Sequence, residues 1–230
     1  MPRFEKREIH KVFLRFSNLA LAKNLSPNLL AELCGVALEL RGALRGQGGI
    51  AMRYSSKELE QRAVLDAAAR MCAAARTAPK TKGEDRLETC VLTGEEKARL
   101  AAHMRELAAK FDYAFFLRDA DNLDTADCVV LLGVREKRRG LGEGCGYCHF
   151  HGCADCAEHG GLCAFDAIDV GIAAGSAAAA AADARVDSRV MFSVGRTAQE
   201  LGFLPDSTLI LGIPVSVSAK SPFFDRKPKK

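Results

Sequence analysis

Residues 143–163, EGCGYCHFHGCADCAEHGGLC, concentrate five of the nine cysteines and three of the five histidines of this chain in one glycine-rich segment. The cysteines, spaced C-x2-C-x4-C-x2-C-x6-C, are Cys145, Cys148, Cys153, Cys156 and Cys163. In a C-x2-C pair a tight turn brings both sulfur atoms to one metal, and neighbouring glycines let the backbone wrap closely around it. The segment therefore predicts a metal centre, which the rest of the fold has to support.

Two kinds of centre suit this segment. A structural zinc ion takes four ligands at tetrahedral angles, whereas an iron–sulfur cluster takes four thiolates around a larger cube. Zinc ribbons usually place their two C-x2-C pairs well apart. Here only four residues separate the pairs, which favours a loop wound around a cluster, with zinc and purely structural thiols as the alternatives. Because enough thiolates are available, His149, His151 and His159 are expected to be solvated or to lie behind the ligands.

The run EGCGYCHFHGC with a downstream cysteine resembles the small 4Fe-4S domain of electron-transfer and corrinoid-linked proteins. That domain has the pattern C-G-x-C, four residues, C, and then a more distant C. The resemblance implies that the metal ligands are Cys145, Cys148, Cys153 and Cys163. Because the gap before Cys163 is shorter than is usual in that domain, Cys156 is the alternative fourth ligand.

Composition favours a soluble, cytoplasmic protein of one main domain. No apolar run approaches the roughly 18–20 residues that span a bilayer, and the N-terminus MPRFEKREIHKVF does not resemble a secretory signal. The scattered cysteines are expected to be reduced core residues: Cys34, Cys72, Cys90 and Cys128. Residues 1–50 carry eight Lys/Arg against four Asp/Glu, so the net charge of +4 leaves residues 51–230 neutral. A neutral body argues against a nucleic-acid partner, and no membrane partner is expected.

Periodicity and capping signals predict alternating helices and strands. Two helices are expected before residue 50, the second from Ser26 to Gly46, followed by a flexible joint. Capping boxes at Ser55 and Thr93 each predict the start of a further helix, and the second is expected to turn Phe111 inward. Strands are expected over 87–92, 128–134 and 207–215, the middle one buried on both faces. A short helix is expected to end at Gly202. This alternation is typical of α/β or α+β proteins.

The alanine-rich segment 167–182 predicts a further helix. Its small side chains favour close packing against another backbone, and Gly171 with Gly175 forms a G-x-x-x-G face. We interpret its apolar stretch as too short to cross a bilayer. The segment therefore predicts a helix in the core or at a dimer interface.

Three longer segments, at 73–104, 166–203 and 209–227, resemble a family of prokaryotic ferredoxin-domain proteins of unknown function, over roughly residues 52–228. They are similar, more distantly, to FMN-dependent nitroreductases. The resemblance implies an α+β, three-layer, nitroreductase-like fold for residues 52–230, with an iron–sulfur insert at 140–165. It also implies a homodimer with FMN at the subunit interface. Residues 1–51 fall outside the resemblance and are expected to form a helical extension, unless the chain start assigned here lies upstream of the native one.

FMN needs cations or a helix N-terminus for its phosphate, and backbone donors for its ring. A loop after the first domain helix, a later turn and the C-terminal tail supply such groups: Arg76, Thr77, Pro79, Lys80, Lys82, Ser193, Gly195, Arg196, Lys220 and Arg226. Surface ion pairs and a plain helix stop explain the same residues without a flavin. The sequence Arg53-Tyr54-Ser55 is similar to the nitroreductase R-x-S motif, but Ser55 also serves as a helix cap.

These patterns predict a 4Fe-4S protein, either a flavin-linked oxidoreductase or an electron-transfer protein with a redox partner. The alternative is a non-enzymatic metal-binding module, holding a cluster or zinc, on a nitroreductase-like core that lacks flavin. The chain has no Ser/His/Asp set, paired-carboxylate signature or Walker loop, so hydrolase and nucleotide-driven functions have no support in the sequence.

Overall fold

The computed structural model describes residues 53–224. The chain divides into two compact units, Met1–Arg53 and Tyr54–Lys230, and the description below concerns the second. The predicted N-terminal helices, Cys34 and Arg226 lie outside the described residues.

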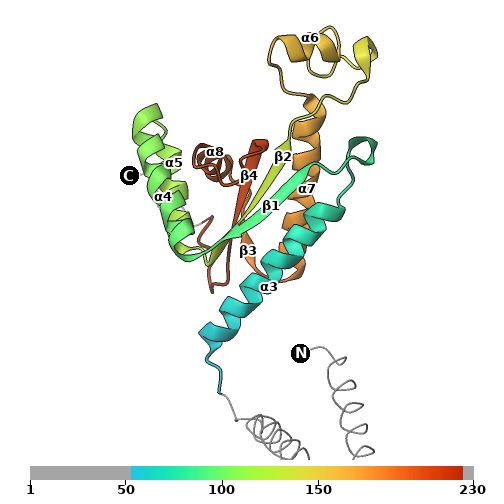
Figure 1. The fold of residues 1–230 in the computed structure, drawn as a ribbon. Coiled ribbons are helices and arrows are strands. Elements are labelled where there is room, and N and C mark those ends of the chain that lie inside the picture. The colour runs from blue at the N-terminus through green and yellow to red at the C-terminus, as the bar shows by residue number, and fades with distance from the viewer. Residues whose placement is uncertain (1–52, 225–230) are drawn as a thin grey trace, which may run out of the picture. The chain divides into compact units, whose positions relative to one another are not determined.

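Three layers form the second unit, with helices on both faces of a four-stranded sheet (Figure 1). The strand order is β1-β2-β4-β3 and every pairing is antiparallel. The strands are β1 (Leu87–Leu92), β2 (Cys128–Arg135), β3 (Asp187–Ser188) and β4 (Ser207–Ser216). One face packs against α3 (Ser56–Thr77) and α7 (Ala164–Asp183), and the other against α4 (Gly94–Phe111), α5 (Ala114–Thr125) and α8 (Phe192–Glu200). The predicted α+β, three-layer class is confirmed.

Strand β2 lies at the centre of this arrangement because its residues face two cores in turn. Val130 and Leu132 pack into the core under α3 and α7, whereas Val129 and Leu131 pack into the core under the other three helices. Seven of its eight residues are buried, from Cys128 to Val134. The continuous apolar run therefore reports a strand covered on both faces, as predicted.

The two predicted capping boxes differ in the structure. Ser55 accepts from the backbone N–H of Glu58, whose carboxylate accepts from the backbone N–H of Ser55, so the box at α3 is confirmed. Thr93 does occupy the N-cap of α4, but its side chain makes no capping hydrogen bond. The expected box there is wrong, because the Glu96 carboxylate accepts instead from Arg99, at 3.0 Å.

Other boundaries also differ from the prediction. Phe111 is 39% exposed rather than inward, because α4 ends there and its ring lies against Tyr113 on the surface. Helix α5 was not predicted, although Phe116, Ala120 and Leu123 show helical spacing. Arg76 and Thr77 were predicted to lie in the loop after this helix, but α3 continues through Thr77 and includes both. The loop that follows contains η1 (Thr81–Gly83).

Helix α7 spans 20 residues and is long and apolar enough to cross a membrane by length and composition alone, so the interpretation that it is too short was wrong. Packing gives the better account of it. Val170, Ala173, Ala177 and Ala181 are buried against α3 and the sheet, as expected of a core helix. Its first two turns also bury the carboxylates of Asp166 and Asp169.

The cysteine segment lies between β2 and α7, beyond the end of the sheet (Figure 1). It contains η2 (Gly142–Gly144) and α6 (Cys153–Glu158), so a short helix replaces part of the expected loop. Arg86 anchors the start of this insert by donating to the carbonyls of Arg135 and Glu136, at 3.0 and 3.1 Å. The insert is thus attached to the β1–β2 edge of the sheet at one end and to α7 at the other.

Candidate metal centre

All five clustered cysteines line one pocket. Three different elements bring them there. Cys145 and Cys148 lie in the turns after η2, Cys153 and Cys156 lie one helical turn apart on α6, and Cys163 is the N-cap of α7. Cys156 and Cys163 are buried and the other three are half-buried. The cysteines of the described residues are free thiols.

Backbone amides surround the Cys153 sulfur. The backbone N–H groups of Gly142, Leu141 and Gly140, together with the charge of Arg138, act against burial and hold the pKa of the Cys153 thiol below its ordinary value. Gly140 and Gly142 have φ of +68° and +65°, a conformation that glycine adopts without strain. These glycines therefore form an anion-binding turn beside one predicted ligand.

Cys156 has a different environment. Its Sγ donates to the carbonyl of Gly161 at 3.3 Å, and burial raises the pKa of its thiol despite the nearby charge of Arg138. It also interacts with the Cys148 thiol. Gly161 is confined there, because an added Cβ would lie 2.3 Å from the Phe150 ring and 3.0 Å from the Cys156 sulfur. Cys156 is therefore positioned by the insert itself as well as lining the pocket.

A buried ionic network supports the base of the pocket. Arg139 is 2% exposed, and its Nη2 lies 2.9 Å from Asp166 Oδ1 and 2.8 Å from Asp169 Oδ2. Burial acts to lower the pKa of Arg139, but the hydrogen bond to Asp169 and the two carboxylates raise it above its ordinary value. Asp169 Oδ1 accepts from the backbone N–H and hydroxyl of Thr81, at 3.0 and 2.8 Å. The network joins the insert, α7 and η1.

Sequence reasoning missed these charged residues. The run REKRRG at 135–140 suggests solvated charge, yet Arg138 and Arg139 both line the pocket. The available signal was a pair of carboxylates three residues apart, Asp166 and Asp169, at the start of an otherwise apolar helix. Because buried carboxylates need a cationic or hydrogen-bonding partner, that spacing could have indicated a buried arginine.

The three histidines of the insert lie outside the pocket lining and are exposed. His159 Nδ1 lies 2.8 Å from Asp155 Oδ1, and its ring stacks on Phe150. Among residues 53–224 no cluster of three or more His, Cys, Asp or Glu side chains has the geometry to hold a single metal ion.

The first group of predicted flavin residues lies at the end of α3, where intrachain contacts engage most of it. Arg76 pairs with Asp85 at 2.7 Å, and Lys82 Nζ donates to the carbonyl of Arg139 at 3.2 Å. The ammonium of Lys80 donates to three carbonyls at the end of α3, those of Ala75, Arg76 and Ala78. The Thr77 hydroxyl donates to the carbonyls of Ala73 and Ala74, and Pro79 follows the end of the helix.

The second group lies on α8, across the sheet from α3. Ser193 donates to the buried carboxylate of Asp119 at 2.6 Å, and Arg196 pairs with Glu200 at 2.6 Å. Gly195 contacts the β4 backbone. Lys220 lies in the tail, where its carbonyl accepts from Ser218. Within one chain the sheet separates the α3 group from the α8 group, so the flavin assignment stays a prediction.

Comparisons with known proteins identify a family model and a relative that match this chain. Residues 159–226 match the family model described as "Uncharacterized protein containing a ferredoxin domain (DUF2148)", a range that includes Cys163 but not the other four clustered cysteines. An uncharacterized protein of Archaeoglobus fulgidus is 38% identical over 187 residues, which cover 78% of this chain and 100% of that protein.

Solved structures with a similar arrangement include a nitroreductase family protein from Clostridium novyi, with a TM-score of 0.47, 15% identity and coverage of 70% of this chain and 76% of that one. A nitroreductase with bound FMN from Desulfitobacterium hafniense has a TM-score of 0.45, 14% identity and coverage of 74% and 81%. Since both TM-scores lie below 0.5, no cofactor is transferred from these proteins to this chain.

Proposed function

Because this chain belongs to the family of uncharacterized proteins that contain a ferredoxin domain (DUF2148), we propose that it is an iron–sulfur protein of electron transfer or redox chemistry. The observation that carries the proposal is the convergence of five cysteines from separate elements on one pocket. Thiolates are the ligands that iron–sulfur clusters take. The cluster would accept and release single electrons, and the protein would hold it and control its exposure to water.

The pocket fits such a group in two respects. Its lining supplies five thiols, and a cluster takes four thiolates. Two buried donors at the pocket, the Nε atoms of Arg138 and Arg139, have no hydrogen-bond partner among the described residues. Buried donors rarely stay unpaired, and the sulfur atoms of a cluster are suitable acceptors.

The proposed cluster is 4Fe-4S, and the proposed ligands are Cys145, Cys148, Cys153 and Cys163. Cys156 remains the alternative fourth ligand, because it lines the same pocket. Its hydrogen bond to the Gly161 carbonyl gives it a role without a metal and favours Cys163.

Anaerobic purification and reconstitution test this assignment. We expect about four iron and four sulfide per chain, a broad absorption band near the visible region that bleaches on reduction, and no stoichiometric zinc. Single Cys→Ser changes at the four proposed ligands should each remove most of the iron, whereas Cys156→Ser should retain it. A colourless protein with one zinc per chain would refute the proposal. Iron loss in Cys156→Ser but not in Cys163→Ser would show that Cys156, not Cys163, is the fourth ligand.

Whether the core also binds FMN decides between a flavin-linked oxidoreductase and a cluster-carrying module without flavin. The sequence resemblance of residues 52–228 to FMN-dependent nitroreductases supports FMN, and the intrachain contacts of Lys80 and Ser193 favour the module. Flavin fluorescence in the supernatant of heat-treated protein distinguishes the two. Iron without flavin, and no uptake of added FMN, would leave the cluster and remove the flavin.

A further inference from the structure

We propose that Arg138 donates a hydrogen bond and positive charge to the sulfur atoms of the cluster in the thiol pocket, and thereby raises its reduction potential. This inference rests on the proposed function and assigns a positioning and tuning residue to the same site. No covalent bond of the protein chain forms or breaks. One electron from an external reductant enters the cluster, and Arg138 stabilises the more negative state.

The contacts of Arg138, which lines the pocket, hold its guanidinium but leave its Nε without a partner among the described residues. Its Nη2 donates to the carbonyl of Gly161 at 2.8 Å, and its Nη1 pairs with the carboxylate of Glu136. These two contacts hold the guanidinium at the pocket wall. Its Nε is buried and has no hydrogen-bond partner within residues 53–224. The two anchored nitrogens therefore fix a guanidinium whose Nε–H group lacks an acceptor.

The same side chain lies among the thiols. Arg138 lines the pocket with all five cysteines; it acts on the Cys156 thiol by a hydrogen bond and by its charge, and on the Cys153 thiol by its charge. The Gly161 carbonyl, which accepts from Arg138 Nη2, also accepts from the Cys156 thiol. Arg138 thus links α6, which carries two of the cysteines, to the chain that leaves β2.

Arg139 provides a contrast within the same pocket. Its charge faces two buried carboxylates, Asp166 and Asp169, whose side chains are at most 7% exposed. Arg138 faces a single carboxylate, Glu136, whose side chain is 30% exposed and screened by water. Carboxylates therefore neutralise the positive charge of Arg138 less than that of Arg139. Arg139 acts mainly to hold the insert on α7.

Hydrogen bonds to the sulfur atoms and nearby positive charge are among the factors that set cluster potentials. Both stabilise the state with one more electron. Removing the Arg138 charge should therefore make the cluster harder to reduce, while the four thiolate ligands stay in place.

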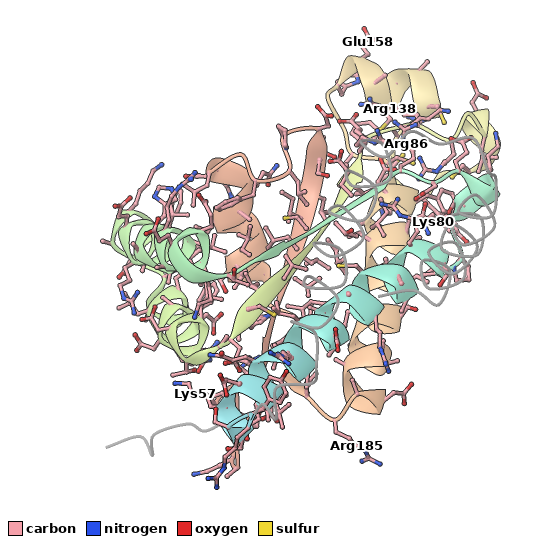
Figure 2. All side chains as sticks on the ribbon, turned by 60° about the horizontal axis from the view of Figure 1, so that its bottom comes forward. Lys57, Lys80, Arg86, Arg138, Glu158 and Arg185 are labelled. Carbon is pink, nitrogen blue, oxygen red and sulfur yellow. The ribbon has the colours of Figure 1, made fainter. Side chains whose placement is uncertain are left out.

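The test is a dithionite titration of the reconstituted full chain, followed by electron paramagnetic resonance, for wild type, Arg138→Gln and Arg138→Lys. The matched control is Arg185→Gln, a change of the same charge at the opposite end of the domain from Arg138 (Figure 2). We expect Arg138→Gln to shift the reduction equilibrium at least tenfold toward the oxidised form, about 59 mV lower for one electron. Arg138→Lys should lie in between, and Arg185→Gln should match wild type.

Iron and sulfide content distinguishes a failure of the proposed function from a failure of the role proposed for Arg138. Failure of wild type to bind a cluster refutes the proposed function. A full cluster in Arg138→Gln with an unchanged potential refutes the role of Arg138 alone. If Arg138→Gln binds no cluster, Arg138→Lys decides: a potential below wild type supports the inference, and an unchanged potential overturns it.

Discussion

At the scale of single residues, Gly195 shows why a predicted binding residue can have a packing role instead. An added Cβ there would lie 1.9 Å from the carbonyl oxygen and 2.5 Å from the carbonyl carbon of Ile210. These are backbone atoms of β4, which cannot swing away as a side chain would. The close approach of α8 to β4 thus requires glycine at this position, whether or not a flavin is bound.

Gly195→Ala should therefore destabilise the domain by about 1–3 kcal/mol or more, as overpacking does. Guanidinium unfolding measures the effect. The matched control is Gly144→Ala, where an added Cβ meets nothing within 4 Å, so the change should stay within about 0.5 kcal/mol. Equal unfolding free energies for wild type and Gly195→Ala would contradict the packing role.

At the scale of elements, α7 combines two functions along one helix. Its alanines pack closely against α3 and the sheet, while its first turns place two carboxylates under the insert. Asp169 has the wider role, because it binds both Arg139 of the insert and Thr81 of η1. Helix α7 therefore fixes the position of Arg139, at the base of the thiol pocket, relative to η1.

Asp169→Ala should cost about 3–5 kcal/mol, because it leaves the buried Arg139 with a single carboxylate partner. Denaturant unfolding of the cluster-free chain checks the value without interference from metal binding. Asp183→Ala, at the exposed end of the same helix, is the control and should change stability by less than about 0.5 kcal/mol. Similar losses in both variants would mean that the network contributes little.

At the scale of the whole molecule, α7 leaves an apolar stripe uncovered. Ile168 and Ile172 are each 41% exposed, and Gly171 and Gly175 between and beside them face open space. These positions follow helical spacing and form one face. The sequence analysis expected this helix in the core or at a dimer interface, and a second copy of the chain is the proposed cover for its outer face.

Size-exclusion chromatography with light scattering should then show a dimer for the full chain. Ile172→Lys should shift it toward monomer, because a charge on the stripe would be buried without a partner. Leu117→Lys, at a comparably exposed apolar position on α5, should leave the dimer intact. A strict monomer for wild type would remove the interface from the proposal.

The sequence by itself determined the features that depend on local patterns. Periodicity identified α3, β2 and β4 because each buries a regular set of neighbours, and the cysteine spacing located the insert between β2 and α7. Cap geometry was predicted correctly at Ser55 but not at Thr93, where a neighbouring arginine competes for the glutamate. The tertiary structure alone decided which distant groups meet. It brought Arg138 and Arg139 to the thiols, paired Arg139 with two carboxylates of α7, and separated the predicted flavin residues across the sheet. Such contacts depend on how the chain crosses the sheet and returns, and no spacing along the sequence records that path.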